Sequence, residues 1–118
     1  MQEDFLHYLW KHKKFDVLNL KTTEGEIVSI GFVGTHNHNS GPDFFNAQLK
    51  LDNQLWAGNV EIHIKSSDWF VHDHETDKAY DNVILHVVWE HDIDVYRKDN
   101  TKIPTVALKD FVSTSALN

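Results

Sequence analysis

Residues 41–65, GPDFFNAQLKLDNQLWAGNVEIHIK, contain two strand-like runs joined by a short polar turn, and they decide the fold. The first run, residues 43–51, ends in alternating polar and aliphatic side chains. Residues 52–54 are turn formers, and the second run follows at residues 55–65. The pattern predicts a β-hairpin at the centre of the chain.

The second run ends in VEIHIK, residues 60–65, in which polar and aliphatic side chains alternate. The period of two along a strand sends Glu61, His63 and Lys65 to one face. With Asp43 on the preceding strand, these are groups that bind a divalent metal and position a water molecule. The same alternation is typical of any half-buried strand with a solvated face, so the residues alone leave both interpretations open.

The flanking sequence predicts an α+β fold with a mixed β-sheet, in one domain over residues 1–112 and a tail at 113–118. The nearly all-apolar strand expected at residues 83–89 should lie inside the sheet, and Pro104 places the last strand at an edge. Besides the hairpin, the expected elements are an N-terminal helix at 3–14, strands at 18–22 and 27–33, a short helical crossover in 66–82, an apolar strand at 83–89, and a final hairpin of 95–97 with 103–108.

Composition removes several functional classes. The 118 residues include no cysteine, which excludes disulfides and thiolate metal sites, and the net charge of −7 opposes non-specific binding to nucleic acid. No apolar run approaches the ~20 residues that span a bilayer, and the acidic N-terminus lacks the layout of a signal peptide. We expect a cytoplasmic protein without a membrane partner, and a homo-oligomer is compatible with the sequence.

Nine dispersed histidines add candidate ligands around the hairpin. His72 and His74 form a His-x-His pair shortly after the second strand, and His36 and His38 form another in the loop before Asp43. Imidazole nitrogens with a carboxylate are the ligands of many metal-dependent hydrolases. The competing interpretation is that these are ordinary surface histidines. The predicted metal ligands are Asp43, Glu61, His63, His72 and His74.

This order of elements resembles the αβββαβ core of the PD-(D/E)XK nuclease superfamily, in which an Asp opens one strand and an acid and a Lys lie on the next. The resemblance matches Pro42-Asp43 to the "PD" and residues 60–65 to the acid/Lys strand. It implies a restriction-endonuclease-like fold and Mg²⁺ or Mn²⁺ at the scissile phosphate. The catalytic residues that it implies are Asp43, Glu61, His63 and Lys65, with Lys65 orienting or deprotonating the attacking water.

The chain departs from that superfamily at one position. The acid usually stands two residues before the Lys, where this chain has His63. Glu61 stands four residues before Lys65, ~13 Å along a strand at ~3.3 Å per residue. Either His63 replaces the acid, which favours Mn²⁺ or Zn²⁺, or Asp43, Glu61 and His63 form the site without Lys65.

Over nearly the whole chain, from the first helix to about Asp92, the sequence resembles a bacterial family, domain-of-unknown-function family 2851. The motifs that carry this resemblance are GPDFFNAQLKL at 41–51 and LWAGNVEIHIKSSDWFVHDHETDKAYDNVILHVVWEHD at 55–92. Members of that family are several times longer, so the resemblance implies the N-terminal part of a longer protein. It implies no activity.

The sequence is therefore compatible with three functions. The first is a divalent-metal phosphodiesterase of nuclease type, whose nucleic-acid substrate would need a local basic patch on this acidic chain. The second is a non-catalytic structural or interaction domain, which predicts that Asp43 and Glu61 are occupied by salt bridges or lie far apart, with carboxyl oxygens more than roughly 8–9 Å from each other. The third is a His-rich metal-binding domain, with zinc held through His72 and His74.

Overall fold

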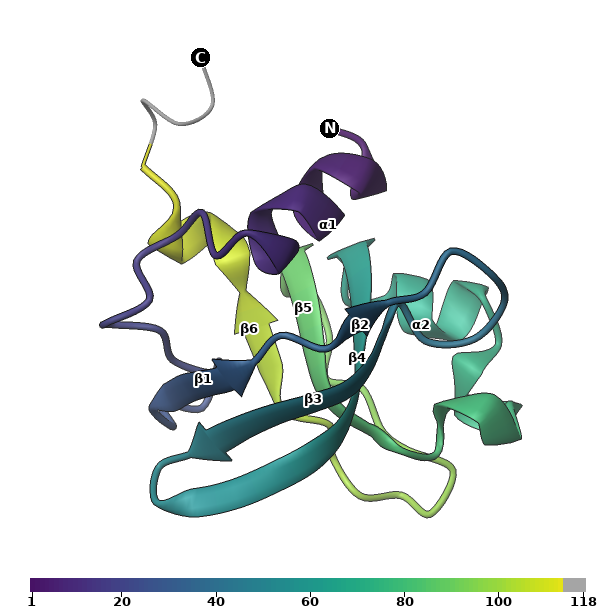
Figure 1. The fold of residues 1–118 in the computed structure, drawn as a ribbon. Helices are drawn as coiled ribbons and strands as arrows, with labels where there is room; N and C mark the ends of the chain where they lie inside the picture. Colours follow the sequence, from purple (N-terminus) through teal and green to yellow (C-terminus); the bar gives the residue numbers. More distant parts are fainter. Residues whose placement is uncertain (114–118) are drawn as a thin grey trace.

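The fold is α+β, as predicted, in a computed structural model that describes residues 1–113 (Figure 1). Residues 114–118 of the expected tail lie outside the described residues. Within the described part, no helix is long and apolar enough to cross a bilayer. The elements are α1 (Glu3–Lys11), β1 (Val28–Phe32), β2 (Thr35–His36), β3 (Phe44–Leu51), β4 (Gln54–Lys65), α2 (Asp68–Val71), η1 (His74–Thr76), η2 (Lys78–Tyr80), β5 (Val83–Glu90), β6 (Thr105–Ala107) and η3 (Leu108–Phe111).

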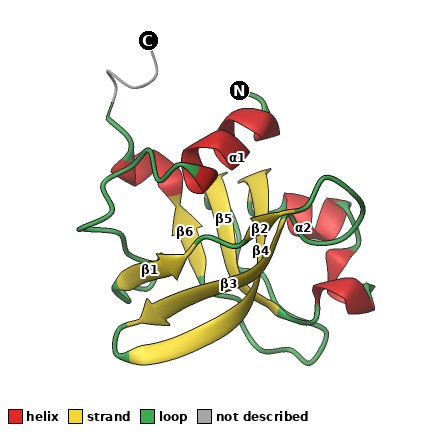
Figure 2. Cartoon of the chain, in the orientation of Figure 1, coloured by secondary structure: helices red, strands yellow, loops and turns green. Residues whose placement is uncertain are grey.

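The six strands form one mixed sheet in the order β1-β3-β4-β5-β6, with β2 also paired to β3 (Figure 2). The β1–β3 and β3–β4 pairs are antiparallel, whereas the β4–β5 and β5–β6 pairs are parallel. The β3–β4 hairpin, the interior position of the apolar strand β5 and the edge position of the strand after Pro104 confirm the sequence predictions. Strand β4 is the middle strand of this order, and its residues 60–63 are buried on both faces of the sheet, whereas residues 54–57 are exposed.

The predicted strand at residues 18–22 is wrong. Only one isolated bridge forms there, between Lys21 and Ile27, and Leu18 is 89% exposed. The Asp16 carboxylate accepts a hydrogen bond from the Asn19 side-chain amide. Such local bonds offer the backbone an alternative to a sheet ladder, and they hold a turn where the residue pattern indicates a strand.

Helix α1 covers one face of the sheet. Its buried residues Leu6, Leu9 and Trp10 belong to the larger hydrophobic cluster, together with Val60 and Ile62 of β4. The Trp10 indole N–H donates to the Val33 carbonyl at 3.0 Å, which fixes the helix over the sheet. Burying these aliphatic and aromatic groups supplies most of the favourable free energy of folding.

The opposite face of β4 lies under α2, η1 and η2, whose Trp69 and Tyr80 form a second, smaller cluster. Glu61 and His63 point toward this layer and are only 4% and 1% exposed. The interpretation of these residues as a solvated strand face is therefore wrong. A strand period of two shows which residues share a face, but not whether a later segment covers it.

The exit from β4 is fixed by Asp92, which lies just after β5. Its carboxylate accepts hydrogen bonds from Ser66 Oγ at 2.7 Å, Ser67 Oγ at 2.6 Å and Ser67 N at 2.9 Å. These charge-assisted bonds hold the start of α2 at the ends of two neighbouring strands. The chain that follows α2 is thereby directed back over Glu61 and His63.

Candidate metal centre

His63 lies at the centre of a group of histidines. Its Nε2 is 3.1 Å from Nδ1 of His72 and 3.3 Å from Oε2 of Glu61. His74 Nε2 approaches the same Glu61 oxygen at 2.8 Å. One ring nitrogen from each of His63, His72 and His74 lies within 4.8 Å of the other two. On its other side, His63 Nδ1 is 2.7 Å from Nε2 of His86.

Two structural features bring these side chains together. The parallel pairing of β4 and β5 sets Glu61 beside His86, so the strands supply a rigid base. Helix α2 ends at Val71 with His72 as its C-cap, and Asp73 then adopts a left-handed conformation with φ of 57°. That turn reverses the chain and places His74 over the sheet. His86 is fully buried and hydrogen-bonded, as a core histidine in this strand should be.

His63, His74 and His86 are neutral at neutral pH. Burial, and then the neighbouring His74 and His72, lowers the pKa of His63 to about 3. Burial, with His72 beside it, lowers the pKa of His74 to about 4, and burial holds the pKa of His86 well below its usual value. Because a metal binds the lone pair of neutral imidazole, these shifts keep the rings in the form that acts as a ligand.

Asp43 and Glu61 lie next to each other beside the histidines. The Asp43 N–H donates to Glu61 Oε1 at 3.1 Å, and the Ile62 N–H donates to Asp43 Oδ2 at 2.8 Å. Burial and the adjacent Asp43 raise the pKa of Glu61 far above its usual range. Burial alone would raise the pKa of Asp43 too, but hydrogen bonds from His7, Glu61 and Ile62 lower it. The pair therefore shares one proton at neutral pH.

The proximity of Asp43 and Glu61 bears on the choice between a metal site and a non-catalytic structural domain. A purely structural or interaction domain predicts that Asp43 and Glu61 lie far apart or are occupied by salt bridges. The structure places the Asp43 backbone nitrogen 3.1 Å from Glu61 Oε1, and it also sets His63 and His74 beside Glu61 and His7 beside Asp43. The two acidic residues are therefore neighbours, and their histidine partners are compatible with a metal site and with a structural domain.

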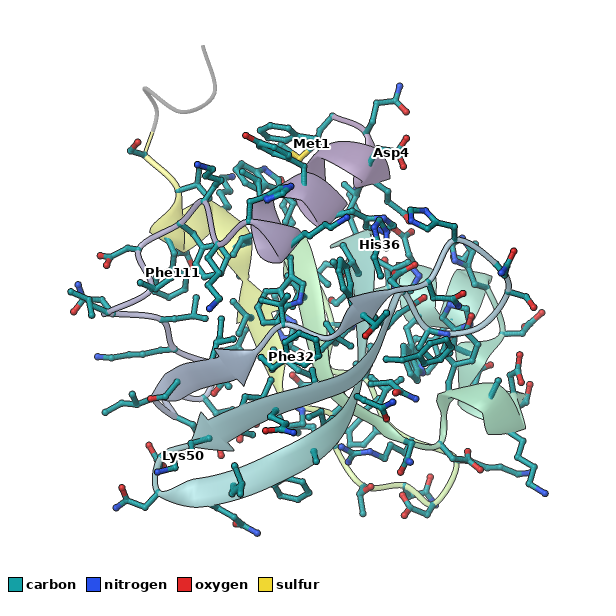
Figure 3. All side chains as sticks on the ribbon, viewed as in Figure 1. Met1, Asp4, Phe32, His36, Lys50 and Phe111 are labelled. Atoms are coloured by element: carbon teal, nitrogen blue, oxygen red, sulfur yellow. The ribbon has the colours of Figure 1, made fainter. Side chains whose placement is uncertain are left out.

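His7, for which the sequence indicates no role, reaches this carboxyl pair from α1. Its Nε2 is 3.5 Å from Asp43 Oδ2, and its Nδ1 is 3.3 Å from Nε2 of His36. Figure 3 shows His36 on β2 below α1, and its ring lies 4.1 Å from that of His38. Burial would lower the pKa of His7, but the hydrogen bond and charge of Asp43 raise it above its usual value.

The structure thus brings together most of the predicted site residues but not all of them. Glu61, His63, His72 and His74 converge, and Asp43 adjoins them. Lys65 is exposed at the end of β4 and makes no ion pair with any residue in 1–113. Its backbone N–H donates to the Asp68 carboxylate at 3.1 Å. The sequence of residues 60–65 leaves two alternatives, a site in which His63 replaces the acid beside Lys65 and a site formed without Lys65. These contacts favour the site without Lys65.

The distances between ligand atoms suit one small cation. Nitrogen and oxygen ligands at ~2.0–2.2 Å in a tetrahedron lie ~3.3–3.6 Å apart. The separations of 3.1 and 3.3 Å from His63 Nε2 come close to this value, whereas the 2.8 Å between His74 Nε2 and Glu61 Oε2 is a direct ion-pair distance that would have to lengthen around an ion. The His74 Nε2 is buried and makes no aligned hydrogen bond with any described residue, although it lies near Glu61. The histidine trio can therefore hold a metal ion.

The buried histidines predict a pH dependence of stability for the metal-free protein. Below about pH 6.5 the unfolded chain protonates His63, His74 and His86, whose pKa values are lowered in the folded chain, so stability falls with the pH toward about 3–4. Each such histidine lowers the free energy of unfolding by up to about 1.4 kcal/mol per pH unit. The raised pKa values of Glu61, His7 and Glu3 act in the opposite direction and reduce the net slope.

Urea unfolding with a chelator present, at pH values from 4.5 to 7.5, measures this dependence. The slope should be smaller in His74→Gln and unchanged in His91→Gln, because His91 is paired with Asp94 at the surface. A free energy of unfolding that does not vary across this range would contradict the buried, neutral state of the histidines.

Comparison with known proteins identifies one family. The model of a protein family of unknown function, DUF2851, matches residues 3–118. No curated protein and no solved structure matches the chain.

Proposed function

We propose that this chain, which belongs to the DUF2851 family of proteins of unknown function, is a metal-dependent hydrolase domain that cleaves phosphodiesters. The observation that carries the proposal is the convergence of nitrogens from His63, His72 and His74 around the Glu61 carboxyl group, beside Asp43. A bound divalent ion would lower the pKa of a water molecule and supply a nucleophile at neutral pH.

The donor set favours Zn²⁺ or Mn²⁺ over Mg²⁺. Imidazole nitrogens suit zinc and other transition metals, whereas Mg²⁺ prefers oxygen ligands and retains several waters. His72 is exposed, whereas His63 and His74 are buried, so water and substrate would reach the ion from the side of His72. Asp43 lies next to Glu61 and is placed to accept a proton from the attacking water.

Two features support a phosphodiester as the substrate. The order α1, β1, β3, β4, α2, β5 follows the αβββαβ pattern of the nuclease superfamily, which is an analogy of fold alone. Lys11, Lys13 and Lys14 are exposed at the C-terminal end of α1, and Lys11 is near enough to lower the pKa of His36 further after burial and His38. This local basic patch offsets the net charge of −7 near the site.

Calorimetric titration with Zn²⁺, Mn²⁺ and Mg²⁺, followed by cleavage assays on single- and double-stranded oligonucleotides, tests the proposal. We expect Zn²⁺ or Mn²⁺ to bind and to support cleavage, and His74→Ala to weaken binding by at least about 10–100-fold. His91→Ala is the matched control, since His91 lies outside the group. Failure of all three ions to bind would refute the proposal.

A second candidate is a non-catalytic metal-binding domain. It is favoured by the number of protein ligands, because three nitrogens and one carboxylate fill a tetrahedral coordination sphere and leave no position for water. Tight binding of Zn²⁺ without cleavage of any oligonucleotide would support this candidate over the first.

A further inference from the structure

We propose that a second divalent cation binds next to the first, between Asp43 and His7, with the Glu61 carboxylate shared between the two ions. The site would then be a two-metal centre. This inference rests on the proposed function of the first site, but it requires separate residues, from α1 and from the segment before β3.

The first observation is the relation between His7 and Asp43. Their Nε2 and Oδ2 atoms are 3.5 Å apart, at the far limit of a hydrogen bond. His7 Nε2 is nevertheless buried, and within residues 1–113 this long contact with Asp43 does not have the geometry of a well-aligned hydrogen bond. Two ligand atoms bound to one ion at ~2.0–2.2 Å are separated by about this distance. A cation between them would give the buried nitrogen a partner.

The second observation is that His7 is oriented in the same way as His63. In His63 one ring nitrogen faces the Glu61 carboxyl group and the other is 2.7 Å from His86. In His7 one ring nitrogen faces the Asp43 carboxylate and the other is 3.3 Å from His36. A metal-binding histidine typically has its second nitrogen held by such a hydrogen-bond partner, which fixes the ring and its tautomer.

The third observation is the position of Glu61 between the two groups. Its Oε2 faces His63 and His74, while its Oε1 faces the Asp43 backbone N–H at 3.1 Å. The two oxygens of one carboxylate can bind two metals ~3.5–4 Å apart, as in two-metal hydrolases.

A second cation also fits the substrate class. Two adjacent divalent ions stabilise both the attacking and the leaving oxygen of a phosphoryl centre. They would also draw a polyanionic substrate to a chain with a net charge of −7. Hydrolysis consumes one water, which adds hydroxide to phosphorus and gives its other proton to the leaving oxygen, so no further reactant is needed.

The stoichiometry of Mn²⁺ binding tests the inference. The ion is titrated calorimetrically, and its electron paramagnetic resonance spectrum shows whether two bound ions are exchange-coupled. We expect two ions and a coupled spectrum in the wild type, and one ion with an uncoupled spectrum in His7→Gln. His12→Gln is the matched control, because this exposed histidine follows the same helix and its ring lies 5.0 Å from that of Tyr8. It should retain two ions.

His36→Ala provides an independent measurement that leaves the ligands in place. Loss of its contact with His7 should weaken the second ion by about 10–100-fold and leave the first unchanged. One ion in the wild type, or two coupled ions in His7→Gln, would overturn the inference. If that single ion is lost in His74→Ala, the proposed function still stands, whereas binding of no ion would refute both.

Discussion

Glu61→Gln is expected to weaken Zn²⁺ binding by about 100-fold or more, because it removes the anionic ligand at the centre of the site. Glutamine keeps the shape of the side chain and can still hydrogen-bond to Asp43. It cannot supply the negative charge that Glu61 acquires when a cation displaces its proton. The change therefore separates a role in metal binding from a role in packing, and calorimetric titration measures it.

The same variant should fold as well as the wild type without metal. Burial and Asp43 raise the pKa of Glu61, so the folded chain holds it neutral at pH 7, as glutamine is. A raised pKa contributes stability that is fully present below the unfolded pKa and is lost as the pH rises. Glutamine does not titrate, so the metal-free Glu61→Gln variant should be more stable than the wild type at pH values above the unfolded pKa of 4.5, and its advantage should grow as the pH rises.

Glu90→Gln is the matched control for both measurements. Glu90 lies at the end of β5 and makes only a 3.8 Å surface ion pair with Lys109. Exposed pairs of this kind contribute about 0–1 kcal/mol, so neither stability nor metal affinity should change much. Zn²⁺ affinity equal to wild type in Glu61→Gln would remove Glu61 from the site.

The part of the site that lies on β4 follows from the sequence. The alternation over residues 60–65 predicts that Glu61 and His63 share a face, and the Gly-Pro-Asp motif predicts that Asp43 begins the neighbouring strand. Both statements depend only on the strand period and on local turn chemistry. They are the kinds of property that a short stretch of sequence determines.

The burial of that face and the role of His7 could not be predicted in this way. Glu61 and His63 are buried because α2, η1 and η2 fold back over them, after Asp92 has fixed the direction of α2. His7 contacts Asp43 across 36 positions of sequence. Its spacing in α1 indicates only a wetter face of a helix, since periodicity within one element carries no information about its partners.

The covering layer itself depends on Trp69, and Trp69→Ala is expected to lower the free energy of unfolding by about 3–5 kcal/mol. Trp69 is fully buried, and its ring lies 5.2 Å from that of His74, 5.8 Å from Tyr80 and 5.4 Å from His86. Alanine would leave a cavity between α2 and β5. Urea unfolding of the metal-free protein measures the loss.

Two variants distinguish the cavity from other effects of the change. The Trp69 indole N–H has no hydrogen-bond partner among the described residues, so Trp69→Phe keeps most of the packing and should cost far less than alanine. Trp56, which is 36% exposed on β4, is the matched control, and Trp56→Ala should cost about 1–2 kcal/mol or less. Equal losses in Trp69→Ala and Trp56→Ala would contradict a central role for Trp69.

The metal affinity should also fall more in Trp69→Ala than in Trp69→Phe. The Trp69 ring packs against His74, while the strands hold Glu61 and His63 independently. In Trp69→Ala, Zn²⁺ affinity should fall through loss of the His74 position, and the remaining affinity should be insensitive to a further His74→Ala change. In Trp69→Phe the two histidine contacts persist, so His74→Ala should still produce its full effect. Additive losses in the Trp69→Ala, His74→Ala double variant would show that the layer stabilises the fold without positioning the ligand.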